Sequence, residues 1–268
     1  IVNSSFSKNF AFADNGALGL ETNGTVYLQN CHFQGNTAKR DGGAMALIKE
    51  AFANVTNCTF SNNWAYSRAG VMHIGPKSEM HVSESQFLNN TSGDEVGAIY
   101  AVFDAKVHVK SSTFQYNSAN YGAVALSQND SLISFNNCTI AKNKAKQGIV
   151  SAYHGSIRIE HCTISYNKGM LIALAYDNSK LYISHSNIHS NDLSKLFIDI
   201  SQSTILKMVS VNLSNHYHDQ PVINVEKMSQ IEMESCYFTH NKVAVLKMGS
   251  QSAGAIADTI FHNNKGFV

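Results

Sequence analysis

One short pattern recurs along the whole chain and limits what it can fold into. A small residue, usually Cys or Ser, is followed two positions later by Phe or Ile and three positions after that by Asn. The pattern returns every 22–27 residues and gives eleven copies, one of them degenerate (Val211, Leu213, His216). Repeats of this length are typical of stacked architectures, in which each unit packs only against its neighbours. Nearly all 268 residues therefore belong to one repeat array.

Each repeat contains three stretches with the alternating pattern of a short strand. A Gly-Ala-apolar marker, such as Gly43-Ala44-Met45, opens the first stretch. An alternating pair such as Val26 and Leu28 forms the second and leads into the Cys/Phe pattern of the third. Because apolar residues at every second position indicate a strand with one buried face, we expect three short strands per repeat.

These features predict an all-β fold, a right-handed single-stranded parallel β-helix of about eleven coils. Residues 1–268 would form a single domain. The chain begins with Ile1 rather than Met, so we expect a processed product or a segment of a longer protein. The alternative is a leucine-rich repeat, but only 15 of the 268 residues are Leu.

The recurring Asn is expected to lie at a corner of each coil. Asn tolerates a left-handed backbone, and its amide can bond to the same Asn in the coils above and below. Such a ladder would account for much of the Asn content, which is 28 residues. The predicted ladder comprises Asn9, Asn36, Asn63, Asn90, Asn117, Asn143, Asn167, Asn191, Asn241 and Asn263.

The combination of F-x-x-N with G-G-A-[ILVM] resembles a known family. It is seen in Phe33 to Asn36 and in Gly42-Gly43-Ala44-Met45. The repeats resemble those of the chlamydial-type polymorphic outer-membrane proteins and, more broadly, the pectate-lyase-like β-helix superfamily. The likeness is clear over residues 1–150 and weaker afterwards. It implies a role as a surface adhesin or passenger domain.

The composition argues against several classes of partner. Only 15% of residues are charged and the net charge is +1, so we expect no nucleic-acid binding. The longest apolar stretch, residues 170–176, is far shorter than a membrane-spanning helix, so we expect no membrane insertion. No cofactor-binding motif is present, and we expect no cofactor.

Nine N-x-[ST] sequons favour an extracellular or cell-surface glycoprotein. The alternative is that they are polar turn residues without glycans. Asn57 and Asn137 each precede a Cys that is expected to point inward, so their side chains should face solvent. The sequons begin at Asn3, Asn23, Asn54, Asn57, Asn89, Asn90, Asn129, Asn137 and Asn212.

The five Cys residues leave two possibilities open. Cys31 and Cys58, like Cys138 and Cys162, would stack in neighbouring coils, close enough for a strained disulfide or for a row of buried thiols.

His residues also stack in this arrangement. His81 would lie over His108 and His161 over His185, and such pairs bind a metal weakly or simply face solvent. No Cys/His spacing typical of zinc is present, and we assign no metal site.

Enzymes with this fold cleave acidic polysaccharides, so we searched for converging carboxylates. The best candidates for a catalytic group are Glu232, Glu234 and Lys207, but charge compensation on the surface explains them equally well. We therefore expect a non-enzymatic structural or adhesive protein, a building block of a surface fibre or assembly. The alternative is a β-helix that binds or cleaves a polysaccharide.

Two regions are expected to contact partners. Longer turns at residues 38–40, 65–68 and 92–95 line one edge of the N-terminal half, where a ligand such as cell-surface carbohydrate would bind. The ends of the β-helix would expose unpaired strands, which other copies or flanking β-helix segments would cover.

Overall fold

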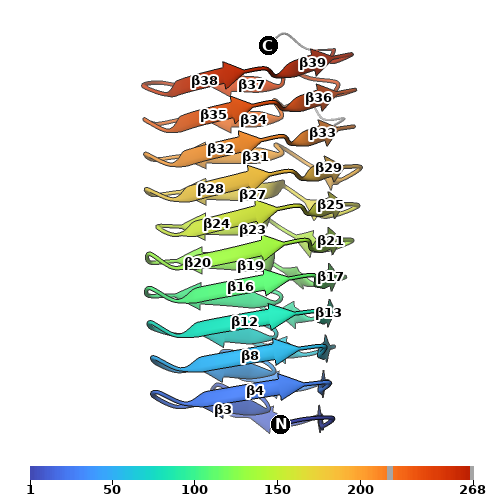
Figure 1. Cartoon of the computed structure of the whole chain (residues 1–268), viewed down its shortest axis with the longest axis vertical. Coiled ribbons are helices and arrows are strands. Elements are labelled where there is room, and N and C mark those ends of the chain that lie inside the picture. The colour runs from blue at the N-terminus through green and yellow to red at the C-terminus, as the bar shows by residue number, and fades with distance from the viewer. Residues whose placement is uncertain (216–219, 266–268) are drawn as a thin grey trace.

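The computed structural model is a rod of stacked coils and describes residues 1–215 and 220–265. Each strand pairs in parallel with the equivalent strands of the neighbouring coils, and the N-terminus and the last strand lie at opposite ends of the rod (Figure 1). The described residues contain no helix. The predicted all-β parallel β-helix is thus confirmed.

Sheet 1 carries the Phe or Ile of the repeats, with Leu213 in the degenerate copy, and has eleven strands. Its strands are β1 (Ser5–Ser7), β5 (His32–Gln34), β9 (Thr59–Ser61), β13 (Gln86–Leu88), β17 (Thr113–Gln115), β21 (Thr139–Ala141), β25 (Thr163–Ser165), β29 (Asn187–His189), β33 (Asn212–Ser214), β36 (Tyr237–Thr239) and β39 (Ile260–His262).

Sheet 2 was not predicted, and it makes four strands per coil rather than three over most of the rod. Its eight strands follow the ladder Asn and are only two residues long, too short to show alternation in the sequence. They are β2 (Phe10–Ala11), β6 (Thr37–Ala38), β10 (Trp64–Ala65), β14 (Thr91–Ser92), β18 (Ser118–Ala119), β22 (Lys144–Ala145), β26 (Lys168–Gly169) and β30 (Asp192–Leu193).

Sheets 3 and 4 have ten strands each and supply most of the aliphatic core. Sheet 3 contains β3 (Leu18–Leu20), β7 (Met45–Leu47), β11 (Met72–Ile74), β15 (Ile99–Val102), β19 (Gly122–Gln128), β23 (Gly148–Tyr153), β27 (Leu171–Tyr176), β31 (Ile198–Ser201), β34 (Ile223–Val225) and β37 (Leu246–Met248). Sheet 4 contains β4 (Thr25–Gln29), β8 (Phe52–Thr56), β12 (Glu79–Ser83), β16 (Lys106–Lys110), β20 (Leu132–Asn136), β24 (Ser156–Glu160), β28 (Lys180–Ser184), β32 (Ile205–Val209), β35 (Gln230–Glu234) and β38 (Ala253–Ala257).

The Asn side chains of successive repeats form a hydrogen-bonded ladder. Asn63 is typical, because its Nδ2 donates to the Phe33 carbonyl (2.9 Å) and to Oδ1 of Asn90 (3.0 Å). Its own Oδ1 accepts bonds from Nδ2 and the backbone N–H of Asn36. The same links between amides join Asn9, Asn36, Asn63, Asn90, Asn117, Asn143, Asn167 and Asn191. His216, which takes the Asn position in the degenerate copy, lies outside the described residues.

The left-handed backbone at this corner belongs to a different residue from the one expected. It is the residue before the ladder Asn that has positive φ, for example Asn62 (55°) and Asn89 (53°). In the last repeat Phe261 is in register with Phe238, so Asn264 rather than Asn263 accepts the bond from Asn241. Asn263 instead has φ of 53°. The prediction of Asn263 as the ladder residue was wrong by one position, because the adjacent residues Ile260 and Phe261 both fit the apolar position of the repeat.

Like residues stack on like inside the rod. Phe33, Phe60, Phe87 and Phe114 are fully buried, and the centroids of consecutive rings are 4.9, 5.1 and 4.4 Å apart. The following coils place Ile140, Ile164 and Ile188 in the same row. Sheet 1 is therefore held by an aromatic stack that continues as an aliphatic one.

The five cysteines are free thiols in a buried row that they share with serines. The Cys58 backbone N–H donates to Ser85 Oγ (3.0 Å), as that of Cys31 does to Cys58 Sγ (3.3 Å). Either side chain therefore serves as the acceptor that this position needs. Burial raises the pKa of Cys58 to about 11, which keeps its thiol protonated at neutral pH.

Candidate functional site

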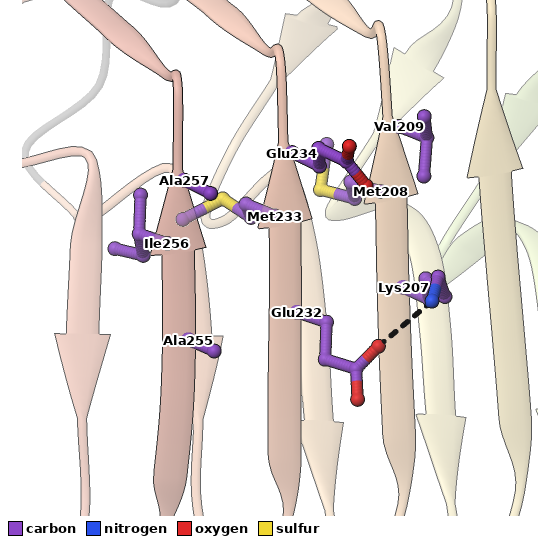
Figure 2. A pocket seen from close by; sticks show the side chains of 9 residues that line it. All are labelled: Lys207, Met208, Val209, Glu232, Met233, Glu234, Ala255, Ile256 and Ala257. Atoms are coloured by element: carbon purple, nitrogen blue, oxygen red, sulfur yellow. Dashed lines mark hydrogen bonds and ion pairs between the residues drawn. The ribbon is translucent and has the colours of Figure 1, made fainter.

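The structure brings two of the three predicted catalytic candidates together as an ion pair. Lys207 in β32 and Glu232 in β35 are in register, and Lys207 Nζ lies 2.9 Å from Glu232 Oε2 (Figure 2). The hydrogen bond with Glu232 raises the pKa of Lys207. Glu234 lies two residues further along β35, in register with Val209.

This surface is open to solvent and mostly apolar around the ion pair. The side chains of Lys207 and Glu232 are 46% and 55% exposed. The shallow hollow beside them is lined by aliphatic residues and methionines of three neighbouring strands (Figure 2). The arrangement is that of a surface ion pair on one face of the rod.

The sequons differ in how far their Asn side chains reach solvent. Asn90 is fully buried, and its Nδ2 donates to the Phe60 carbonyl and to Asn117 Oδ1. A glycan on Asn90 would break these hydrogen bonds, because this nitrogen is a member of the ladder. Asn54 and Asn129 are half-buried. The exposed sequon residues are Asn3, Asn23, Asn57, Asn89, Asn137 and Asn212.

The longer turns of the N-terminal half pack over the outer face of sheet 3. Ala69 and Val96, from these turns, form a small second core with Tyr100, Val102 and Leu126 of the sheet. The turns were predicted from their length as the edge where a ligand would bind, whereas the buried cluster beneath them was not predicted.

Ion pairs connect the turns of consecutive coils. Arg40 pairs with Asp14, and Arg68 pairs with the buried Asp41 through two hydrogen bonds of 3.0 and 2.6 Å. His73 lies beside Asp41, and burial lowers the pKa of this His. These ion pairs link each of the first two turns to the preceding coil.

A pocket lined by tyrosines adjoins the third of these turns. Its lining comprises Glu95, Tyr121, Leu126, Gln128, Ser151, Tyr153, Leu174 and Tyr176. The rings of Tyr153 and Tyr176 are 4.7 Å apart at an angle of 43°. Glu95 Oε2 is buried without a hydrogen-bond partner, and burial raises the pKa of this carboxyl. Of the lining residues only Glu95 has a carboxylate, so this lining contains no pair of carboxylates.

Two groups of His and Glu side chains lie on the outside of the rod. Glu79, His81 and His108 form one group, and Glu160, His161 and His185 form the other. Burial lowers the pKa of His108, and the hydrogen bond with His81 lowers the pKa of Glu79. The stacked His pairs were identified in the sequence, but the carboxylates were overlooked, although Glu79 stands only two positions before His81.

Comparison with known proteins identifies the family. No part of residues 1–215 and 220–265 forms a helix long and apolar enough to cross a membrane. No curated protein matches the chain, and no solved structure matches it. The family described as "Right handed beta helix region" matches residues 1–188 and 97–268, which together span the chain. The chain therefore belongs to the right-handed β-helix family.

Proposed function

We propose that this protein is an extracellular, N-glycosylated β-solenoid with a structural or adhesive role and no catalytic activity. The main support is that several sequon residues are exposed along the rod. Asn57 and Asn89 belong to consecutive repeats, and Asn137 belongs to the next repeat but one. Its partners are N-linked glycans, cell-surface carbohydrate and further β-helix coils at the ends of the rod.

The glycan part of the proposal makes a sharp prediction at two overlapping sequons. Thr91→Ala removes the sequon of Asn89, and Ser92→Ala removes the sequon of Asn90. When the chain is secreted from eukaryotic cells, we expect Thr91→Ala to lower the intact mass by one glycan and Ser92→Ala to leave the glycan mass unchanged. The reason is that the Asn89 side chain is exposed, whereas the Asn90 side chain is buried in the ladder.

Glycosidase treatment provides the overall test of this assignment. The mass of the secreted wild-type protein should fall on treatment. Before treatment, the Asn57→Gln variant should be lighter than the wild type by one glycan. An unchanged mass for secreted wild-type protein would contradict the assignment as a glycoprotein. Loss of a glycan with Ser92→Ala would contradict the assignment of Asn90 to the interior.

A second candidate function is carbohydrate binding, and the tyrosine pocket supports it. Aromatic rings that face solvent stack on the apolar faces of sugar rings, and amphipathic Tyr is suited to such contacts. Burial raises the pKa of the Glu95 carboxyl, whose Oε2 has no hydrogen-bond partner and can bond to a sugar hydroxyl group. This combination fits an uncharged sugar unit better than an acidic one.

Paired variants test this second candidate. In a binding assay with neutral oligosaccharides, Tyr153→Ala and Tyr176→Ala should each weaken binding about tenfold, a loss of about 1.4 kcal/mol. The exposed Tyr27→Ala, on sheet 4, is the matched control and should have no effect. Binding that survives both pocket substitutions would exclude the tyrosine pocket as the site.

A further inference from the structure

Three potential metal ligands converge on the outer face of sheet 4. Glu79 and His81 lie two residues apart on β12 and so face the same side. His108 in β16 is directly in register with His81. One donor atom from each of the three side chains lies within 4.8 Å of the donors of the other two.

Little rearrangement would bring these donors around one ion. Zinc-to-nitrogen and zinc-to-oxygen bonds of about 2.0 to 2.2 Å in a tetrahedron place neighbouring donors roughly 3.3 Å apart. His81 Nε2 and Glu79 Oε1 are already 2.7 Å apart. Rotation of the three side chains is enough, and the backbone beneath them is fixed by pairing on both sides of β12 and β16.

Ser134 selects the ring form of His108 that a metal requires. Its Oγ lies 2.8 Å from His108 Nδ1, and its hydroxyl donates to the Val107 carbonyl (3.3 Å). Since the hydroxyl proton is used in that bond, Oγ accepts the Nδ1–H of His108. The lone pair of Nε2 is then free, as in the hydrogen-bonded His ligands of metal sites.

The second His and Glu group is less suited to an ion. The rings of His161 and His185 are stacked 4.8 Å apart and only 24° from parallel. Their lone pairs lie in the ring planes and therefore run side by side instead of converging. The rings of His81 and His108 are tilted by 79°.

We propose that Glu79, His81 and His108 bind a divalent transition-metal ion of the zinc class, with Ser134 as a positioning residue. The His2Glu donor set leaves one coordination position open to water. Lys106, in register with Glu79, adds a positive charge nearby, so we expect a dissociation constant on the order of 10 µM. This site is independent of the extracellular role proposed above.

Calorimetric titration of the full chain with Zn²⁺ tests the site. Protein made in bacteria is used, because Asn54, a sequon residue, is in register with His81 and a glycan there would crowd the ion. We expect one ion per chain. Glu79→Gln, His81→Ala and His108→Ala should each weaken binding at least tenfold, and Ser134→Ala should weaken it by about tenfold.

The second group supplies the matched control. The double variant His161→Ala/His185→Ala should bind Zn²⁺ as the wild type does. Circular dichroism establishes that each variant is folded. Failure of the folded wild type to bind Zn²⁺ saturably at about 100 µM would overturn the proposal, and so would loss of binding in the control alone.

Discussion

Replacement of Phe87 by Ala is expected to lower the free energy of unfolding by about 3–5 kcal/mol. Phe87 is fully buried, and its ring stacks between Phe60 and Phe114 with interplanar angles of 16° and 9°. Ala at this position leaves a cavity with rings above and below it and removes two aromatic contacts. Urea unfolding followed by circular dichroism measures the loss.

Two further variants show how much of this loss comes from the cavity and how much from the aromatic contacts. Phe87→Leu should cost only about 1–2 kcal/mol, because later coils place Ile in the same row. Phe12→Ala, at a ring that is 79% exposed, should change stability by about 0.5 kcal/mol or less. A Phe87→Ala protein as stable as Phe12→Ala would show that the stack contributes little.

The Asn ladder gives the second large effect, because each amide belongs to two coils. Asn117 donates Nδ2 to the Phe87 carbonyl and to Asn143 Oδ1, and its Oδ1 accepts two bonds from Asn90. Asn117→Ala leaves the Asn90 donors and the Phe87 carbonyl buried without these partners. An unpaired buried polar group costs about 1–3 kcal/mol, so we expect a total loss of about 3–5 kcal/mol.

Asn187→Ala is the matched control for the ladder. Asn187 is an exposed strand residue of sheet 1, and its substitution should cost about 0.5 kcal/mol or less. Urea unfolding of both variants under the same conditions makes the comparison. Equal stability of the two variants would contradict a structural role for the ladder amides.

The sequence was sufficient for the fold because the same residue types return at one spacing. In stacked rows such as the Phe and Asn rows, each residue packs against the same residue type in the next coil. The spacing of the repeat in the sequence therefore shows which residues are in contact. The two-residue strands of sheet 2 left no comparable pattern. The position of Asn264 was missed because Ile260 and Phe261 both fit the apolar position, and only strand pairing distinguishes them.

The candidate sites were harder to predict because they are exceptions to the repeat. Tyr121, Tyr153 and Tyr176 meet Glu95 only once the turns have packed over sheet 3. Two of the three donors near His81 could be predicted from the sequence, because the repeat places His81 and His108 in register. The third donor, Glu79, comes from the same strand and not from a stacked position.

The parallel stacking of coils also determines how the rod would respond to force. The hydrogen bonds between coils run along the rod axis, so tension on the two ends pulls directly on the contacts of one coil with the next (Figure 1). Coils should then peel off one at a time from an end instead of yielding together. Each coil of 22–27 residues would release roughly 75–95 Å of extended chain, so that a short rod can absorb a long extension before it fails.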